Sequence, residues 1–92
     1  MGKDRPEGPE AIEIAKFAID KHNKEAKTKL QFESLVKAEK QVVEGINYRI
    51  GINALDGTTS KVYGAIVLVE PWLKFKKLIS FNPLSNQIRR ML

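Results

Sequence analysis

The segment from Gly45 to Ala54 constrains the fold more than any other part of this chain. Apolar residues alternate along it with polar or small ones, and the apolar set is Ile46, Tyr48, Ile50, Ile52 and Ala54. A period of two sends alternate side chains to opposite faces of a strand. The pattern therefore predicts a strand in an antiparallel sheet, with one buried face and one wet face.

A helix is predicted upstream of this strand. From Glu10 to about Lys29, apolar residues recur every three or four positions; they are Ala11, Ile14, Ala15, Ala18, Ile19 and His22. This spacing predicts an amphipathic helix of about four to five turns. Pro9, just before the first turn, and the early acids Glu10 and Glu13 suit its N-terminus.

Three further strands are predicted. They run from Leu30 to Val43, from Lys61 to Val69, and through the apolar residues between Phe75 and Phe81. A change of phase around Ser34-Leu35 indicates a bulge in the first of them. Turns are expected at residues 55–58, which contain Asp-Gly, and at residues 70–73, which contain a proline.

One helix followed by four strands with short connections predicts an α+β domain, in which one long N-terminal helix packs across a four-stranded antiparallel meander. Residues 1–9 are expected to form a flexible arm, residues 10–84 a single domain, and residues 85–92 a tail of unknown structure. In a meander, alternate connections lie at the same end of the sheet. The connections at residues 41–45 and 71–72 should therefore meet there, beside the arm.

The connection Gln41-Val42-Val43-Glu44-Gly45 has unusual chemistry for a turn. Gly45 can take a positive φ, but valine favours a pleated, half-buried surface. Apolar groups held at a hairpin tip suggest contact with another molecule. In the alternative interpretation the turn lies a residue or two away, and both valines belong to strands.

Composition limits the class of protein. At 92 residues the chain has room for one domain, and no apolar run approaches the length of a membrane helix. The polar N-terminus carries no secretory signal, so the sequence predicts a soluble protein without naming its compartment. It would be secreted or vacuolar if a signal has been removed, and cytoplasmic otherwise.

The net charge of +5 favours acidic partners, nucleic acid among them. Along the predicted helix, however, lysines alternate with acids, as on a solvated face; they are Lys16, Lys21, Lys24, Lys27 and Lys29. The dense basic patch is Lys74, Lys76 and Lys77, beside Trp72 and Phe75. Nucleic-acid binding is therefore not the favoured function.

Three motifs resemble the plant cystatins, which are reversible protein inhibitors of papain-like cysteine proteases. Residues 41–45, QVVEG, fit the family's Q-x-V-x-G first loop, and Pro71-Trp72 matches its second loop. Residues 14–23, IAKFAIDKHN, are similar to the plant L-A-R-F-A-V-x-E-H-N helix signature. All three occur in order, and the similarity covers about residues 10–84.

The resemblance implies the cystatin fold and a role in plant defence. It also implies a wedge of the arm and two loops that fills a protease cleft without offering a scissile bond. The protease-binding residues would be Gly8, Gln41, Val42, Val43, Glu44, Gly45, Pro71 and Trp72. No catalytic residue, cofactor or metal is implied.

Two positions depart from the family pattern. Glu44 stands where the family commonly has a small residue, and a carboxylate there must be desolvated or kept wet on binding. Plant members also carry paired glycines well before the helix, whereas this chain has Gly8 close to it and Gly2 further out. Gly8 is the candidate for the contact made by the arm.

Other interpretations remain open at the sequence level. Val62, Ile66 and Leu68 fall on one side of their strand and could mediate self-association, and the family also exchanges its helix and first strand between protomers. The alternative function is a non-inhibitory cystatin-fold module that binds an acidic partner or nucleic acid. His22 lies on the apolar helix stripe and is expected to be structural, because no nucleophile motif accompanies it.

Overall fold

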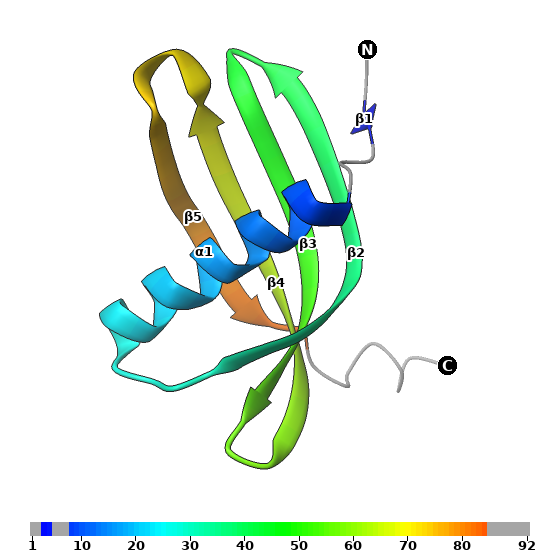
Figure 1. Ribbon diagram of the computed structural model, residues 1–92, viewed down its shortest axis with the longest axis vertical. Coiled ribbons are helices and arrows are strands. Elements are labelled where there is room, and N and C mark those ends of the chain that lie inside the picture. The colour runs from blue at the N-terminus through cyan, green and yellow to red at the C-terminus, as the bar shows by residue number, and fades with distance from the viewer. Residues whose placement is uncertain (1–2, 5–7, 85–92) are drawn as a thin grey trace.

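The computed structural model of the protein describes residues 3–4 and 8–84. It contains a short strand β1 (Lys3–Asp4), one helix α1 (Gly8–Ala26) and four long strands, β2 (Gln31–Val43), β3 (Gly45–Asp56), β4 (Thr59–Glu70) and β5 (Phe75–Pro83). The strands form one antiparallel sheet in the order β1-β2-β3-β4-β5. The predicted meander is confirmed, and β1 adds a strand at its edge that the sequence pattern did not predict (Figure 1).

The helix crosses one face of the sheet, and the core lies between these two layers (Figure 1). Its buried residues are Ala11, Ile14, Ala15, Ala18 and Ile19, which belong to the predicted stripe. The facing strand buries Tyr48, Ile50, Ile52 and Ala54, as its alternation predicted. Full burial of one large apolar side chain contributes about 1.5–3 kcal/mol, so this interface is the main source of stability.

Helix α1 begins at Gly8, two residues before the predicted start. Pro9 thus lies inside the first turn, where its fixed φ and missing N–H are tolerated. His22 packs against Phe81 with ring centroids 4.2 Å apart and nearly parallel planes, consistent with the structural role expected for it. No helix in residues 8–84 combines the length and apolarity needed to cross a membrane.

Asn23 fixes the connection from α1 to β2. Its backbone carbonyl accepts a hydrogen bond from the Thr28 N–H (3.2 Å), while Lys27 adopts a left-handed φ of 59°. Its side-chain amide also donates to the Leu30 carbonyl and accepts from the Leu30 N–H, both at 3.0 Å. These bonds close the end of the helix and direct the chain into the sheet.

The sheet departs from ideal pairing where the sequence pattern changed phase. Register shifts between β2 and β3 fall between Phe32 and Ser34 and between Leu35 and Lys37. At the other end of β3, the turn to β4 is Gly57-Thr58, inside the predicted range. The residues Val62, Ile66 and Leu68 lie on the face of β4 away from the helix. Each is half-buried, so they do not form a fully exposed apolar patch.

Candidate functional site

Two hairpin connections lie side by side at one end of the sheet (Figure 1). The first joins β2 to β3 and the second joins β4 to β5; between them, Ile46 of β3 pairs with Val69 of β4. At the edge of the sheet, β1 pairs with β2 through Lys3 opposite Gln41. The N-terminal segment and both connections therefore approach the same end, as the meander predicted.

The first connection is tighter than the five-residue loop that the sequence suggested. Val43 pairs with Gly45, so β2 runs to Val43 and only Glu44 lies outside the strands. The alternative interpretation, in which both valines belong to a strand, is the correct one. Their side chains are nevertheless exposed, Val42 by 63% and Val43 by 60%, because the hairpin extends past the edge of the core.

Gly45, at the base of the first connection, packs against the end of β4, just before the second connection. It is buried and has a φ of 121°, which residues with a Cβ rarely adopt. A Cβ here would lie 3.0 Å from the Val69 carbonyl oxygen and 3.3 Å from the Glu70 side chain. The first hairpin therefore rests directly on the end of β4, and the two tips are held in a fixed relation.

The second connection is a single 3-10 turn, Pro71–Leu73, with proline in its first turn. Lys74 closes it in a left-handed conformation (φ 50°), and its N–H donates to the Pro71 carbonyl oxygen at 3.1 Å. Trp72 and Leu73 are 64% and 63% exposed, and Phe75 is 41% exposed. The protease-binding residues predicted from the sequence do not include Leu73 and Phe75, although apolar residues flanking a proline turn were an available signal.

The remaining predicted site residues have different surroundings. Gln41, Glu44 and Pro71 are exposed, and Glu44 stands at the tip of the first hairpin. Gly8 is the exposed first residue of α1, with open space where a Cβ would project. It therefore begins the helix instead of lying within the predicted arm.

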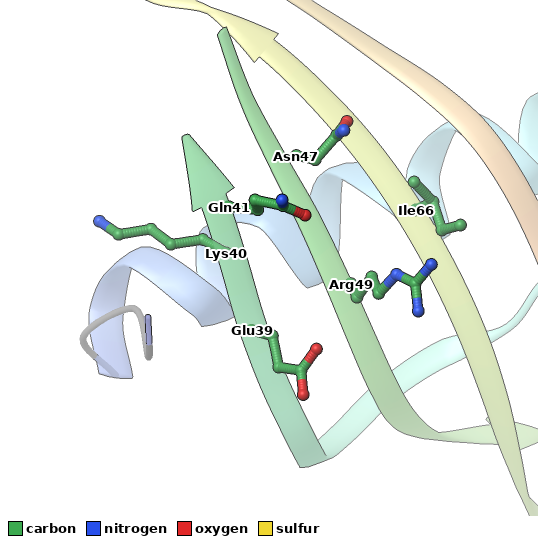
Figure 2. Close-up of a pocket in the computed structure, with 6 residues that line it drawn as sticks. All are labelled: Glu39, Lys40, Gln41, Asn47, Arg49 and Ile66. Carbon is green, nitrogen blue, oxygen red and sulfur yellow. The ribbon is translucent and has the colours of Figure 1, made fainter. Parts of the chain in front are cut away.

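The outer face of the sheet carries a polar hollow of about 140 Å³ below the first hairpin. Figure 2 shows the Glu39 carboxylate extending from β2 toward β3, while the Arg49 guanidinium extends from β3 toward Ile66 of β4, with Gln41 and Asn47 in the next row. Lys40 extends away from these side chains. The hollow is open and mixed in charge, and it connects the base of the first hairpin to the middle of the sheet.

A polar cluster lies on the opposite, helix-bearing side. The Glu10 carboxylate accepts hydrogen bonds from the Tyr48 hydroxyl and from the Lys40 ammonium, the latter at 3.2 Å. Burial raises the pKa of Tyr48 above its ordinary value of 10.0, and the hydrogen bond to Glu10 and the charges of Glu10 and Glu13 raise it further. Tyr48 is therefore a hydrogen-bond donor throughout the neutral range.

The chemistry of the site is that of a binding surface. Among the described residues, no group of three or more His, Asp or Glu side chains is arranged to hold a metal ion. The large apolar side chains exposed at the shared end are Val42, Val43, Trp72 and Leu73, and the polar Gln41, Glu44 and Lys74 are exposed beside them. Apolar tips on a rigid scaffold suit insertion into a groove of another protein.

Comparison with solved structures identifies the fold. A crystal structure of Mialostatin, a gut cystatin from the hard tick Ixodes ricinus, superposes with a TM-score of 0.74 over 88% of this chain and 94% of that one. The two sequences are only 17% identical, so this match defines the fold alone. The protein has the cystatin fold.

Sequence comparison identifies the family. A family profile described as "Aspartic acid proteinase inhibitor" matches residues 6–84. Cysteine proteinase inhibitor 5 of Arabidopsis thaliana is 47% identical over 85% of this chain and 65% of its own length. Cysteine proteinase inhibitor A of Helianthus annuus is 43% identical over 80% of this chain and 90% of its own length. The chain belongs to the plant cystatin family, whose members are proteinase inhibitors and not enzymes.

Proposed function

We propose that this protein reversibly inhibits papain-like cysteine proteases by filling the active-site cleft with its N-terminal segment and two hairpin tips. The observation that carries the proposal is the exposure of large apolar side chains on two adjacent connections, in particular Val43 and Trp72. Membership of a proteinase-inhibitor family supports it, since the matched relatives are named cysteine proteinase inhibitors.

Each element has a distinct task in this proposal. Val42 and Val43 displace water from the walls of the cleft, and Gln41 offers its amide at the rim. Gly45 keeps the first tip seated against the base of the second. Pro71 shapes the second connection, while Gly8 begins the helix from which the N-terminal segment extends.

Trp72 is the main anchor of the proposed complex. A buried tryptophan removes about 150–250 Å² from water, which at about 25 cal/mol/Å² corresponds to several kcal/mol before the costs of association. Those costs include the ordering of mobile side chains and loops. The two tips already stand on paired strands, so little further ordering is needed.

The test is a titration of papain with the protein, using a fluorogenic peptide substrate at several substrate concentrations. Competitive, reversible inhibition is expected, with the protein recovered intact from the mixture. No inhibition at a large molar excess, or cleavage of the chain within either connection, would overturn the proposal. Pepsin, an aspartic proteinase, should be titrated in parallel, because the matching family profile is described as an aspartic acid proteinase inhibitor.

Inhibition of pepsin without inhibition of papain would assign the two tips to another protease class.

The alternative function, a non-inhibitory module that binds acidic partners, is not favoured. In the basic patch of Lys74, Lys76 and Lys77, the Lys76 ammonium already pairs with Glu13 at 3.7 Å and lies over the Phe17 ring.

A further inference from the structure

The cluster around Glu10 links three separate parts of the fold. Glu10 belongs to the first turn of α1, Lys40 to β2 and Tyr48 to β3. The side chains of Lys40 and Glu10 are 25% and 31% exposed, while Tyr48 as a residue is 4% exposed. The bonds from Lys40 and Tyr48 to one carboxylate are thus partly shielded from water, where charge-assisted hydrogen bonds are strongest.

The register of the sheet places this cluster beside the N-terminal strand. Asp4 of β1 pairs with Lys40, and Lys40 pairs in turn with Tyr48, so the three residues form one row across the sheet. Lys40 therefore has two contacts that matter for the site. Its backbone lies opposite β1, and its side chain reaches Glu10.

The next row toward the site contains Lys3 of β1 opposite Gln41 of β2. The strand β1 consists only of Lys3 and Asp4, and so short a strand has few hydrogen bonds of its own. Three residues separate it from the beginning of α1. The Glu10 bonds fix that beginning against β2 and β3.

We propose that Glu10 is a positioning residue for inhibition: its bonds to Tyr48 and Lys40 hold the start of α1 so that β1 stays paired beside the first hairpin. This inference rests on the proposed function, since the N-terminal segment is taken to enter the protease cleft with that hairpin. Glu10 itself is not required to touch the protease.

The inhibition test compares four full-length proteins: the parent, Glu10→Gln, the double variant Lys3→Pro with Asp4→Pro, and the combination of all three changes. The prolines remove the N–H groups of β1 and so prevent its pairing. Glu10→Gln is expected to raise the papain inhibition constant by about fivefold in the parent, as for loss of one charge-assisted contact. In the proline background it should cause no further increase.

Glu13→Gln is the matched control, because Glu13 is the next acid on the same helix and pairs with Lys76. It should leave the inhibition constant unchanged. An equal effect of Glu10→Gln in both backgrounds, or no effect in the parent, would overturn the inference. Thermal unfolding of each variant checks that the sheet is intact.

A second measurement does not depend on inhibition. The chain has no cysteine, so Lys3→Cys with Thr58→Cys gives two spin-label sites, one on β1 and one at the far turn of the sheet. The distribution of distances between the labels should broaden with Glu10→Gln and stay unchanged with Glu13→Gln. The same width in both variants would overturn the inference. If the parent fails to inhibit papain, the proposed function fails, and this measurement alone decides the role of Glu10.

Discussion

The two ends of the same sheet are built from opposite chemistry. At one end Asp56, the last residue of β3, and the turn residues Gly57 and Thr58 are all exposed, and a Cβ on Gly57 would meet nothing within 4 Å. At the other end the β2–β3 connection exposes Val42 and Val43, and its glycine is buried against β4. Both are tight antiparallel hairpins, so the difference does not arise from the needs of chain reversal.

The polar end shows what a turn in this fold requires. Asp-Gly supplies the positive φ of Gly57 (69°) and leaves polar groups in water. At the apolar end, large side chains are exposed to water, and position 45 is restricted to glycine. Features that folding does not require are best explained by binding, and the following predictions test this contrast.

The largest expected difference between the two ends is in affinity for the protease. Trp72→Ala should raise the papain inhibition constant by about 30-fold or more, because a central aromatic anchor contributes at least about 2 kcal/mol. Asp56→Ala, at the polar end, should leave it unchanged, since the exposed Asp56–Lys61 pair contributes little. Similar inhibition constants for both variants would remove the distinction between the ends.

The two glycines should differ in what they contribute to stability. Gly45→Ala is expected to lower the free energy of unfolding by about 2–3 kcal/mol, because the backbone strain adds to a contact of 3.0 Å with the Val69 carbonyl. Gly57→Ala should lower it by about 1 kcal/mol, the usual effect of a side chain at positive φ without a clash. Urea unfolding measures both. Equal losses would show that the two hairpins are not packed differently.

Glu44 sharpens the comparison within the apolar end. Glu44→Ala is expected to tighten inhibition by about fivefold, because the exposed carboxylate at the tip of the first hairpin must lose water or stay wet when the tip enters a cleft. The measurement is the inhibition constant of each protein under identical conditions. An unchanged or weaker inhibition would mean that Glu44 lies outside the contact or finds a partner there.

The smallest effect concerns the scaffold between the two ends. The folded protein raises the pKa of Tyr48 above 10.0, chiefly by burial and then by the bond to Glu10. Below pH 10 the Tyr48 hydroxyl keeps its proton in both the folded and the unfolded protein, and the stabilisation is fully present. As the pH rises above 10, the unfolded state releases the proton first, so the free energy of unfolding should fall.

Tyr48→Phe is the variant that isolates this effect, because it keeps the buried ring and removes the titrating hydroxyl. Its free energy of unfolding should fall less steeply above pH 10 than that of the parent, measured by urea unfolding at a series of pH values. Parallel curves would show that Tyr48 does not contribute to the alkaline loss of stability.

Much of the scaffold could be predicted from periodicity alone. The stripe on α1 and the alternation along β3 specify which faces meet, and Asp56-Gly57 marks one turn directly. The adjacency of the two connections that carry Val43 and Trp72 follows from the meander, because alternate connections return to the same end.

The rest depends on contacts between distant residues. Glu10, Lys40 and Tyr48 meet only after the helix has docked, and Lys3-Asp4 shows no pattern that predicts pairing. The valines were ambiguous because β-branched residues favour strands, and the structure assigns them to β2 while leaving them exposed. The protease contacts themselves stay a prediction.

Hydrogen exchange of the protein alone and mixed with papain tests the contrast between the two ends most directly. We predict slower exchange on binding at the amides of residues 41–45 and 72–74, and unchanged exchange at residues 56–59. Protection at residues 56–59, or no protection at either apolar connection under saturating papain, would contradict the proposal that the apolar end is the binding end.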